Sequence, residues 1–307
     1  MEGNYMKKDA YLAAFINALI IGFSFLFVKL ALTVTDPLNI LAHRFTVAFV
    51  AASIPVIFGW TRLHITFKDI LPILPLSLFY PVMFFTFQTF GLQYISSSEA
   101  GIITAVIPIF TMILASLFLK EYSSLQQKAS LLLSVSGVIY IFVMKGINFK
   151  SASFSGTILI LLSALSSAGY NVLARKFTKK YKVLDLTYMM SFIGFLSFNI
   201  ISIADHIIKG TINVYFKPFA SPLFVISILY LGVLSSLITS LLSNYALSKI
   251  QASNMSVFGN LSTLITMIAG VIFLNESLSY YHIIGAVMII AGIIGMNFMH
   301  KKNNAHI

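Results

Sequence analysis

The chain has 307 residues, of which 58% are hydrophobic and only 9% are charged, and its mean hydropathy is +0.93. Soluble domains carry about a quarter charged residues, so this composition excludes a water-soluble enzyme. The chain contains no cysteine, which excludes disulfides, thiolate metal sites and a cysteine nucleophile, and its formal net charge is +11.

The sequence divides into apolar runs that are each long enough to cross a bilayer, which takes about 20 residues in a helix. The first run, 11–32, is too long for a signal-peptide core and lacks a small-residue cleavage site, so we interpret it as a retained helix. The sequence therefore predicts an all-α integral membrane protein with short connections. The ten predicted transmembrane helices are 11–32, 37–59, 70–92, 99–119, 125–144, 154–174, 184–208, 222–247, 253–274 and 280–299.

The breaks between these runs have local causes. Proline suits the first turn of a helix, so Asp36-Pro37 predicts the start of the second span. Ser124-Leu125-Gln126-Gln127 matches a capping box and predicts the start of the fifth. Pro81 and Pro108 fall inside the third and fourth runs, where the lost backbone hydrogen bond predicts a kink.

The basic residues are distributed unevenly between the two sides of the predicted bundle. With the N-terminus inside, 14 of the 20 fall in inner segments, five fall in outer ends and loops, and Arg44 lies within the second span. Lysine and arginine gather in cytoplasmic loops. We therefore expect both termini in the cytoplasm, and the positive charge needs no nucleic acid to explain it.

The second half of the chain repeats the first. Glu121, Ser124 and Gly137 recur as Glu276, Ser279 and Gly292, a shift of 155 residues in register with the helix ends. Each repeat holds five predicted helices, and because five is odd the two copies enter the membrane from opposite sides. Inverted repeats are typical of secondary transporters. The alternative is a gene duplication without transport.

These features resemble the drug/metabolite transporter superfamily, specifically its ten-helix EamA type. The likeness rests on the two five-helix repeats, on Arg44 in Ala42-His43-Arg44-Phe45, and on the recurring Glu-x-x-Ser pattern with its later glycine. It covers repeats at 11–144 and 154–299. The second repeat departs from the family pattern, because the position that aligns with Arg44 when the two halves are superimposed in sequence is the apolar Met190.

The resemblance implies an uncoupled or proton-linked exporter of small metabolites, such as amino acids, in a bacterial plasma membrane. It also implies a central substrate cavity between the repeats, and helices at the repeat boundaries that provide packing or dimer contacts. A homodimer is therefore one expected assembly.

Polar side chains inside the predicted spans are candidates for substrate contacts, because such groups are costly in lipid and usually face a protein interior or a cavity. The alternative is that amides bridge neighbouring helices. Besides Arg44, the candidate substrate-binding residues are Asn17, Ser24, Tyr80, Gln88, Tyr170, Asn171, Tyr245 and Asn260.

Arg44 lies about two turns into the second span. It could attract a substrate carboxylate in the cavity. It could equally anchor at the outer interface or pair with Asp36.

Glu121 and Glu276 each precede a predicted helix start, where a carboxylate meets free backbone N–H groups. We expect a structural turn role for both rather than proton coupling.

The motifs of enzymes are missing from the sequence: it has no phosphate-binding loop, no His-Glu-x-x-His and no Gly-x-Ser-x-Gly. We therefore expect no catalytic residues, no metal and no cofactor. The sequence favours a secondary transporter that moves its substrate outward over the alternative, a ligand-binding or scaffold membrane protein that transports nothing.

Overall fold

The computed structural model describes residues 2–120, 125–145 and 152–303, and this part of the chain is helical without strands. Most helix boundaries follow the local signals in the sequence. The second span begins at Pro37, and the Asp36 carboxylate caps it by accepting the backbone N–H groups of Leu38 at 3.0 Å and Asn39 at 3.1 Å. An aspartate in this position satisfies N–H groups that have no partner within the helix.

The described first half of the chain forms five helical segments, two of which are interrupted. Its helices are α1 (Glu2–Leu32), α2 (Pro37–Ile57), α3 (Ile70–Ser77), the π-helical η2 (Leu78–Met83), α4 (Phe84–Gly91), α5 (Ser97–Thr104), α6 (Ile107–Leu119) and α7 (Leu125–Lys145). A short 3₁₀ turn, η1 (Phe67–Asp69), precedes α3.

The second half has the same order of continuous and interrupted segments. Its helices are α8 (Ala152–Phe177), α9 (Val183–Ile208), α10 (Pro222–Leu229), the π-helical η5 (Tyr230–Ile238), α11 (Thr239–Lys249), α12 (Ala252–Val257), α13 (Gly259–Leu274) and α14 (Tyr280–Asn303). Two 3₁₀ turns, η3 (Ile212–Val214) and η4 (Lys217–Ala220), lie between α9 and α10.

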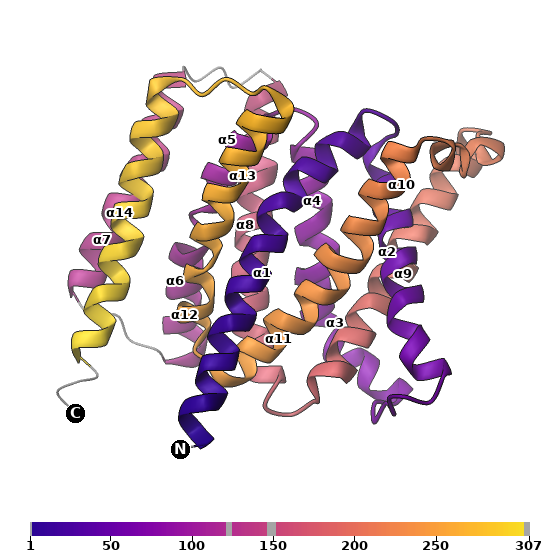
Figure 1. Cartoon of the computed structure of the whole chain (residues 1–307), viewed down its shortest axis with the longest axis horizontal. Coiled ribbons are helices and arrows are strands. Elements are labelled where there is room, and N and C mark those ends of the chain that lie inside the picture. Colours follow the sequence, from indigo (N-terminus) through magenta and orange to yellow (C-terminus); the bar gives the residue numbers. More distant parts are fainter. Residues whose placement is uncertain (1, 121–124, 146–151, 304–307) are drawn as a thin grey trace.

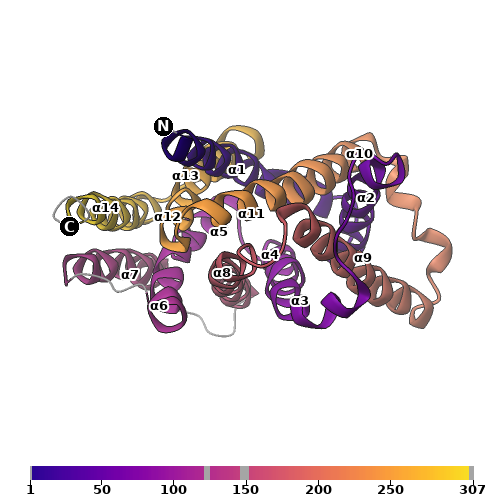
Figure 2. The same ribbon diagram turned by 90° about the horizontal axis from the view of Figure 1, so that it is seen from below.

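Eight of the described helical segments are long and apolar enough to cross a membrane. They are Lys8–Leu32, Pro37–Ile57, Ile70–Gly91, Ser97–Leu119, Ala152–Phe177, Val183–Ile208, Pro222–Lys249 and Ala252–Leu274. The helices α7 and α14 lie side by side at one edge of the bundle (Figure 2). The start of α1 and the end of α14 lie at the same end of the bundle (Figure 1).

The interruptions occur at matching places in the two halves. The π-helical segments η2 and η5 each lie in the middle of the third segment of their half, and the α5–α6 break matches the α12–α13 break. Lys120 and Asn275 end the fourth segment of each half with φ of 57° and 51°, and among the described residues they are the only non-glycine positions with positive φ. They lie 155 residues apart, as do the two glutamates of the sequence repeat.

The two expected proline kinks have different outcomes. The third segment breaks at Tyr80, whose backbone is extended (φ −147°, ψ 115°), immediately before Pro81. Proline disfavours a helical conformation in the residue before it. Pro108 does not lie inside a helix as expected, because the fourth segment is already interrupted before it and Pro108 occupies the first turn of α6.

Glycines bring α7 and α14 into close contact. A Cβ on Gly137 would lie 2.7 Å from the carbonyl oxygen of Gly285, and a Cβ on Gly285 would lie 2.9 Å from the carbonyl oxygen of Gly137. Small residues at a helix–helix contact allow two backbones to approach each other in a membrane. Gly137, the glycine of the repeated motif in the first half, therefore allows α7 and α14 to pack closely.

Candidate functional site

A small cavity lies between the two halves of the bundle, with a volume of about 70 Å³. Residues from six of the interrupted or continuous segments surround it, and none of them carries a formal charge. The lining residues are Asn17, Ile21, Tyr80, Phe84, Ile107, Ser167, Tyr170, Asn171, Thr239, Ser243, Met255, Ser256, Gly259 and Ser262. We call this the central cavity.

Two stacked tyrosines form part of the wall of the central cavity. The rings of Tyr80 and Tyr170 have centroids 4.7 Å apart and an interplanar angle of 27°. The Tyr170 hydroxyl donates to Oδ1 of Asn244 at 2.9 Å, and Nδ2 of Asn244 donates to Oγ1 of Thr187 at 3.0 Å. The helix break at Tyr80 positions one ring of this pair. The hydrogen bonds that connect α8 to α11 and α11 to α9 hold the other ring, that of Tyr170.

One amide of the cavity wall has an acceptor without a hydrogen-bond partner among the described residues. Asn17 lines the central cavity and is 6% exposed, and its Oδ1 has no hydrogen-bond partner among the described residues. Leaving a buried acceptor unsatisfied costs about 1–3 kcal/mol. A donor group on a bound molecule would remove this cost, so Asn17 Oδ1 suits an ammonium or hydroxyl.

Arg44 is fully buried on α2, next to the wall of the central cavity rather than in it. Its Nε donates to Oγ of Ser236 at 2.7 Å, and its Nη2 donates to Oγ of Ser235 at 2.9 Å. Its guanidinium carbon lies 3.8 Å from the ring centroid of Phe85, which packs on Tyr80 with centroids 4.9 Å apart. Nη1 has no hydrogen-bond partner among the described residues.

These contacts exclude two of the three roles that the sequence left open for Arg44. The side chain does not reach the interface, because it is 0% exposed. It does not pair with Asp36 either, since its hydrogen bonds go to η5 and the Asp36 carboxylate caps α2. The outer anchor and the Asp36 ion pair were therefore wrong expectations.

The structure brings four of the predicted substrate-binding residues together at the central cavity, namely Asn17, Tyr80, Tyr170 and Asn171. Four others do not line it. Ser24 donates to the carbonyl of Ile21 in its own helix at 2.7 Å, Arg44 binds η5, and Tyr245 is half-buried beside the core. Gln88 is 1% exposed, and neither of its amide atoms has a hydrogen-bond partner among the described residues.

Two further predicted residues fall where the structure gives no description. The side chain of Asn260 and the whole of Glu121 lie outside the described part of the chain.

Sequence reasoning missed the hydroxyl-rich part of the cavity wall. Ser167, Thr239, Ser243, Ser256 and Ser262 line the cavity, and serine and threonine are common throughout the spans. Single polar residues of this kind carry too weak a signal to be selected. Asn244 carried a signal as an amide inside a span, and it is held behind the wall by Tyr170.

Glu276 contacts the other half of the chain. Its Oε1 accepts the backbone N–H of Ser97 at 2.7 Å, and its Oε2 accepts the backbone N–H of Ser98 at 2.8 Å. The expectation was that the carboxylate would serve the helix that follows it. The structure instead places it at the N-terminus of α5, where unsatisfied N–H groups attract an anion.

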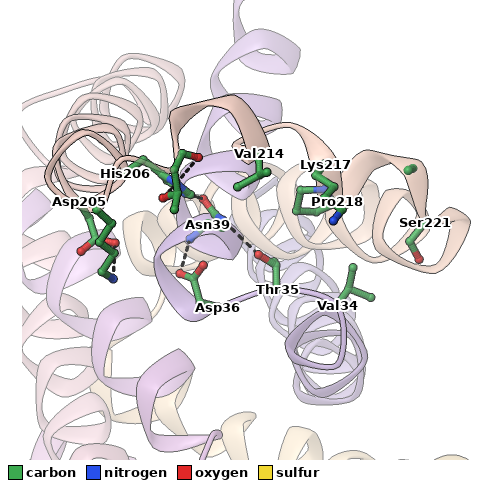
Figure 3. Close-up of a pocket in the computed structure, with 13 residues that line it drawn as sticks. Val34, Thr35, Asp36, Asn39, Asp205, His206, Val214, Lys217, Pro218 and Ser221 are labelled. Carbon is green, nitrogen blue, oxygen red and sulfur yellow. Dashed lines mark hydrogen bonds and ion pairs between the residues drawn. The ribbon is translucent and has the colours of Figure 1, made fainter.

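A second, larger pocket of about 620 Å³ lies at the end of the bundle opposite the start of α1 (Figure 3). We call it the far-end pocket. It is lined by Val34, Thr35, Asp36, Asn39, Asp205, His206, Lys209, Thr211, Val214, Lys217, Pro218, Ala220 and Ser221. These residues come from two connections and the adjoining ends of α2 and α9, which are far apart in the sequence, so no local sequence pattern marks them as a site.

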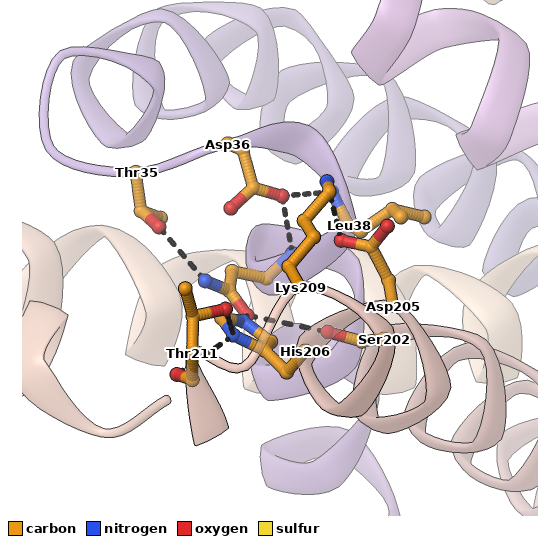
Figure 4. Close-up of polar contacts among 9 residues, drawn as sticks. Thr35, Asp36, Leu38, Ser202, Asp205, His206, Lys209 and Thr211 are labelled. Atoms are coloured by element: carbon orange, nitrogen blue, oxygen red, sulfur yellow. Dashed lines mark hydrogen bonds and ion pairs between the residues drawn. The ribbon is translucent and has the colours of Figure 1, made fainter. Parts of the chain in front are cut away.

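Hydrogen bonds fix the floor of the far-end pocket (Figure 4). Nε2 of His206 lies 2.9 Å from Oδ1 of Asn39, and Nδ1 lies 2.7 Å from Oγ1 of Thr211. Lys209 pairs with Asp205 at 2.7 Å, and this hydrogen bond to the carboxylate raises the pKa of Lys209. Within the described residues, no group of three or more His, Asp or Glu side chains could hold a metal ion.

Comparisons with known proteins agree with this architecture. The sequence model of the EamA-like transporter family matches residues 9–143 and again residues 154–298. The chain is 56% identical over 298 residues to "Uncharacterized transporter YcxC" of Bacillus subtilis, covering 97% of this chain and 96% of that protein.

More distant relatives also match over nearly their full length. The chain is 23% identical to "Probable amino-acid metabolite efflux pump" of Salmonella typhimurium, covering 94% of both proteins. A crystal structure with 16% sequence identity matches the fold with a TM-score of 0.68, covering 96% of this chain and 98% of that one. With two family matches that together span most of its length, this chain belongs to the EamA-like transporter family.

Proposed function

We propose that this protein is a secondary transporter that exports a small, net-neutral polar metabolite, such as an amino acid, across a bacterial plasma membrane. In this proposal ten transmembrane helices form two inverted repeats, 11–144 and 154–299, and both termini are cytoplasmic. Substrate is carried by alternate opening of the two repeats. The Bacillus relative supports the bacterial membrane, and the printed name of the Salmonella relative supports the substrate class.

The observation that carries the proposal is the central cavity. It lies between the two halves, and it offers amide, hydroxyl and tyrosine groups with no charged side chain in its lining. A molecule with a net charge would lose its hydration there without an opposite charge to replace it. An amino acid with an uncharged side chain is a zwitterion with no net charge, and Asn17 Oδ1 is a free acceptor for its ammonium group.

The matching interruptions support the inverted-repeat arrangement. The π-helical segments and the left-handed ends at Lys120 and Asn275 recur at the same places in each half. Discontinuous helices surround the substrate sites of many transporters with inverted repeats. The start of α1 and the end of α14 lie at the same end of the bundle (Figure 1), which supports the proposal that both termini are on one side of the membrane.

The size of the central cavity indicates that substrate binding requires a movement. Sites for small molecules usually measure about 300–1,000 Å³, far more than the 70 Å³ here. The interruptions in the third, fourth, eighth and ninth segments are the places where the helices can bend to enlarge it. π-Helical turns are often found at such functional positions.

Arg44 is a positioning residue in this proposal. It holds Ser235 and Ser236 of η5, and its free Nη1 can attract a carboxylate when the wall at Tyr80 and Phe85 moves. For assembly, we propose that α7 and α14 at the edge of the bundle supply the contacts of any homodimer (Figure 2).

Counterflow in liposomes tests the proposed function. Purified protein is reconstituted with unlabelled amino acid inside, and uptake of the same labelled amino acid is measured across a panel. We expect uptake above that of protein-free liposomes for at least one amino acid, and a large loss with Asn171→Leu. Lys68→Gln, at an exposed position of the 3₁₀ turn η1, is the control and should keep full uptake. Binding without counterflow for every compound would favour the non-transporting receptor or scaffold instead.

A further inference from the structure

The far-end pocket has the charge pattern of a recognition site. Four charged side chains line it, and two of them, Asp205 and Lys209, form an ion pair at 2.7 Å, although Lys209 also interacts electrostatically with Asp36. The remaining two are the Asp36 carboxylate and the Lys217 ammonium. The pocket therefore presents one anion and one cation that do not pair with each other.

Both remaining charges have free capacity. Asp36 uses only Oδ1 to cap α2, and Oδ2 accepts no hydrogen bond from the described residues. Lys217 makes no hydrogen bond or ion pair with any residue in the described ranges. Figure 3 shows Asp36 and Val34 on the α1–α2 side of the pocket, and Lys217 and Pro218 on the opposite side.

The floor of the pocket is buried and held by hydrogen bonds. Asn39 is 4% exposed and His206 is 8% exposed, and each is held by hydrogen bonds to the other and to neighbouring threonines. Val34, Val214 and Pro218 add apolar surface to the lining. A preorganised site of this kind loses little entropy when it binds a ligand.

We propose that the far-end pocket binds a small zwitterion, an α-amino acid with an apolar side chain. Its ammonium group pairs with Asp36, its carboxylate pairs with Lys217, and its side chain lies on the apolar surface of Val34, Val214 and Pro218. The proposal rests on the proposed function for its substrate class, and it adds a second substrate site at the extracellular end. The volume of about 620 Å³ is within the range of small-molecule sites.

The absence of cysteine allows a direct test. Ser221→Cys places a thiol in the pocket lining, and Asn213→Cys places a matched thiol on the same connection at an exposed position outside the lining. The rate of maleimide labelling of each variant is measured in detergent with and without L-leucine. At a leucine concentration of twice its dissociation constant, we expect labelling of Ser221→Cys to slow about threefold by mass action. Labelling of Asn213→Cys should not change.

Single-charge analogues and charge-removing variants test the zwitterion. 3-Methylbutylamine carries only the ammonium, and 4-methylpentanoate carries only the carboxylate, so each should protect Ser221→Cys less than leucine does. Asp36→Asn keeps the helix cap because asparagine also caps helices. This variant and Lys217→Gln should each weaken protection by leucine.

Three results would overturn the proposal. They are equal slowing at both cysteines, no slowing at any leucine concentration, and protection that requires phosphatidylethanolamine and is unaffected by leucine, which would make the occupant a lipid headgroup. Labelling in detergent does not depend on flux. Protection without counterflow would therefore contradict transport alone, and counterflow without protection would contradict only this second site.

Discussion

The carboxylate of Glu276 binds the backbone of Ser98 across the boundary between the two halves of the chain, at 2.8 Å from Oε2 to the N–H group. With the matching bond to Ser97, it closes the N-terminus of α5 from the loop that precedes α14. A residue from the second half thus satisfies helix N–H groups in the first half, and the contact ties the two repeats together at one end of the bundle.

Replacing this carboxylate should destabilise the fold. In Glu276→Gln one oxygen remains and the charge is lost, so we expect a cost of about 1.5–3 kcal/mol, as for hydrogen bonds to charged groups. Thermal unfolding in detergent measures the change. The control is Asp205→Asn, which removes an exposed ion pair worth less than about 1 kcal/mol. Equal changes in the two variants would contradict the capping role.

Gly270 makes room for the Glu276 contact. A Cβ at this position would collide with Oε2 of Glu276 and with the hydroxyls of Ser97 and Ser98. Gly270→Ala should therefore lower the unfolding temperature, although alanine normally stabilises a helix relative to glycine by about 1 kcal/mol. Gly259→Ala is the matched control, because a Cβ there meets nothing within 4 Å. A rise in stability for both variants would show that the loop does not depend on Gly270.

Arg44 should discriminate between substrates by charge. It has a free Nη1 and no carboxylate of a described residue bound to it. We expect Arg44→Gln to reduce counterflow of amino acids that carry a carboxylate more than counterflow of the corresponding amino acid amides. Equal losses for both compounds would assign Arg44 to holding η5 alone.

Asp69 should give the fold an acid-sensitive contribution. The backbone N–H of Thr66, together with its hydroxyl, lowers the pKa of Asp69 from its ordinary value of 3.8. The carboxylate therefore stabilises the folded state above pH 3.8, and the contribution is lost as pH falls through the lower folded pKa. The difference in unfolding temperature between the native chain and Asp69→Asn should be largest near neutral pH and shrink toward pH 3. A difference that stays constant with pH would contradict this.

Much of the fold could be predicted from the sequence, because in a membrane protein the apolar runs and their punctuation set the helices. The Asp36-Pro37 start and the break at Pro81 follow from local chemistry. The matching left-handed ends at Lys120 and Asn275 could not be predicted, since neither residue is a glycine. The correspondence between these two helix ends is recognised only once the structure is compared with the 155-residue shift of the sequence repeat.

The candidate site was predictable only in part. An amide or tyrosine in a span stands out, which led to Asn17, Tyr80, Tyr170 and Asn171. Whether such a residue faces a cavity depends on packing between distant helices, so Gln88 and Tyr245 were selected although neither lines it. The far-end pocket depends on two connections and the adjoining ends of α2 and α9, which meet only in the folded chain.

The most direct test of the account is whether the central cavity opens to both sides of the membrane. Ser167→Cys places a thiol in the cavity lining, and Ser166→Cys places one on the preceding residue, which is 1% exposed and outside the lining. A membrane-impermeant maleimide is applied to right-side-out and to inside-out vesicles. Alternating access predicts labelling of Ser167→Cys from both sides and little labelling of Ser166→Cys from either. Labelling of Ser167→Cys from one side only, in every condition that includes substrate, would contradict it.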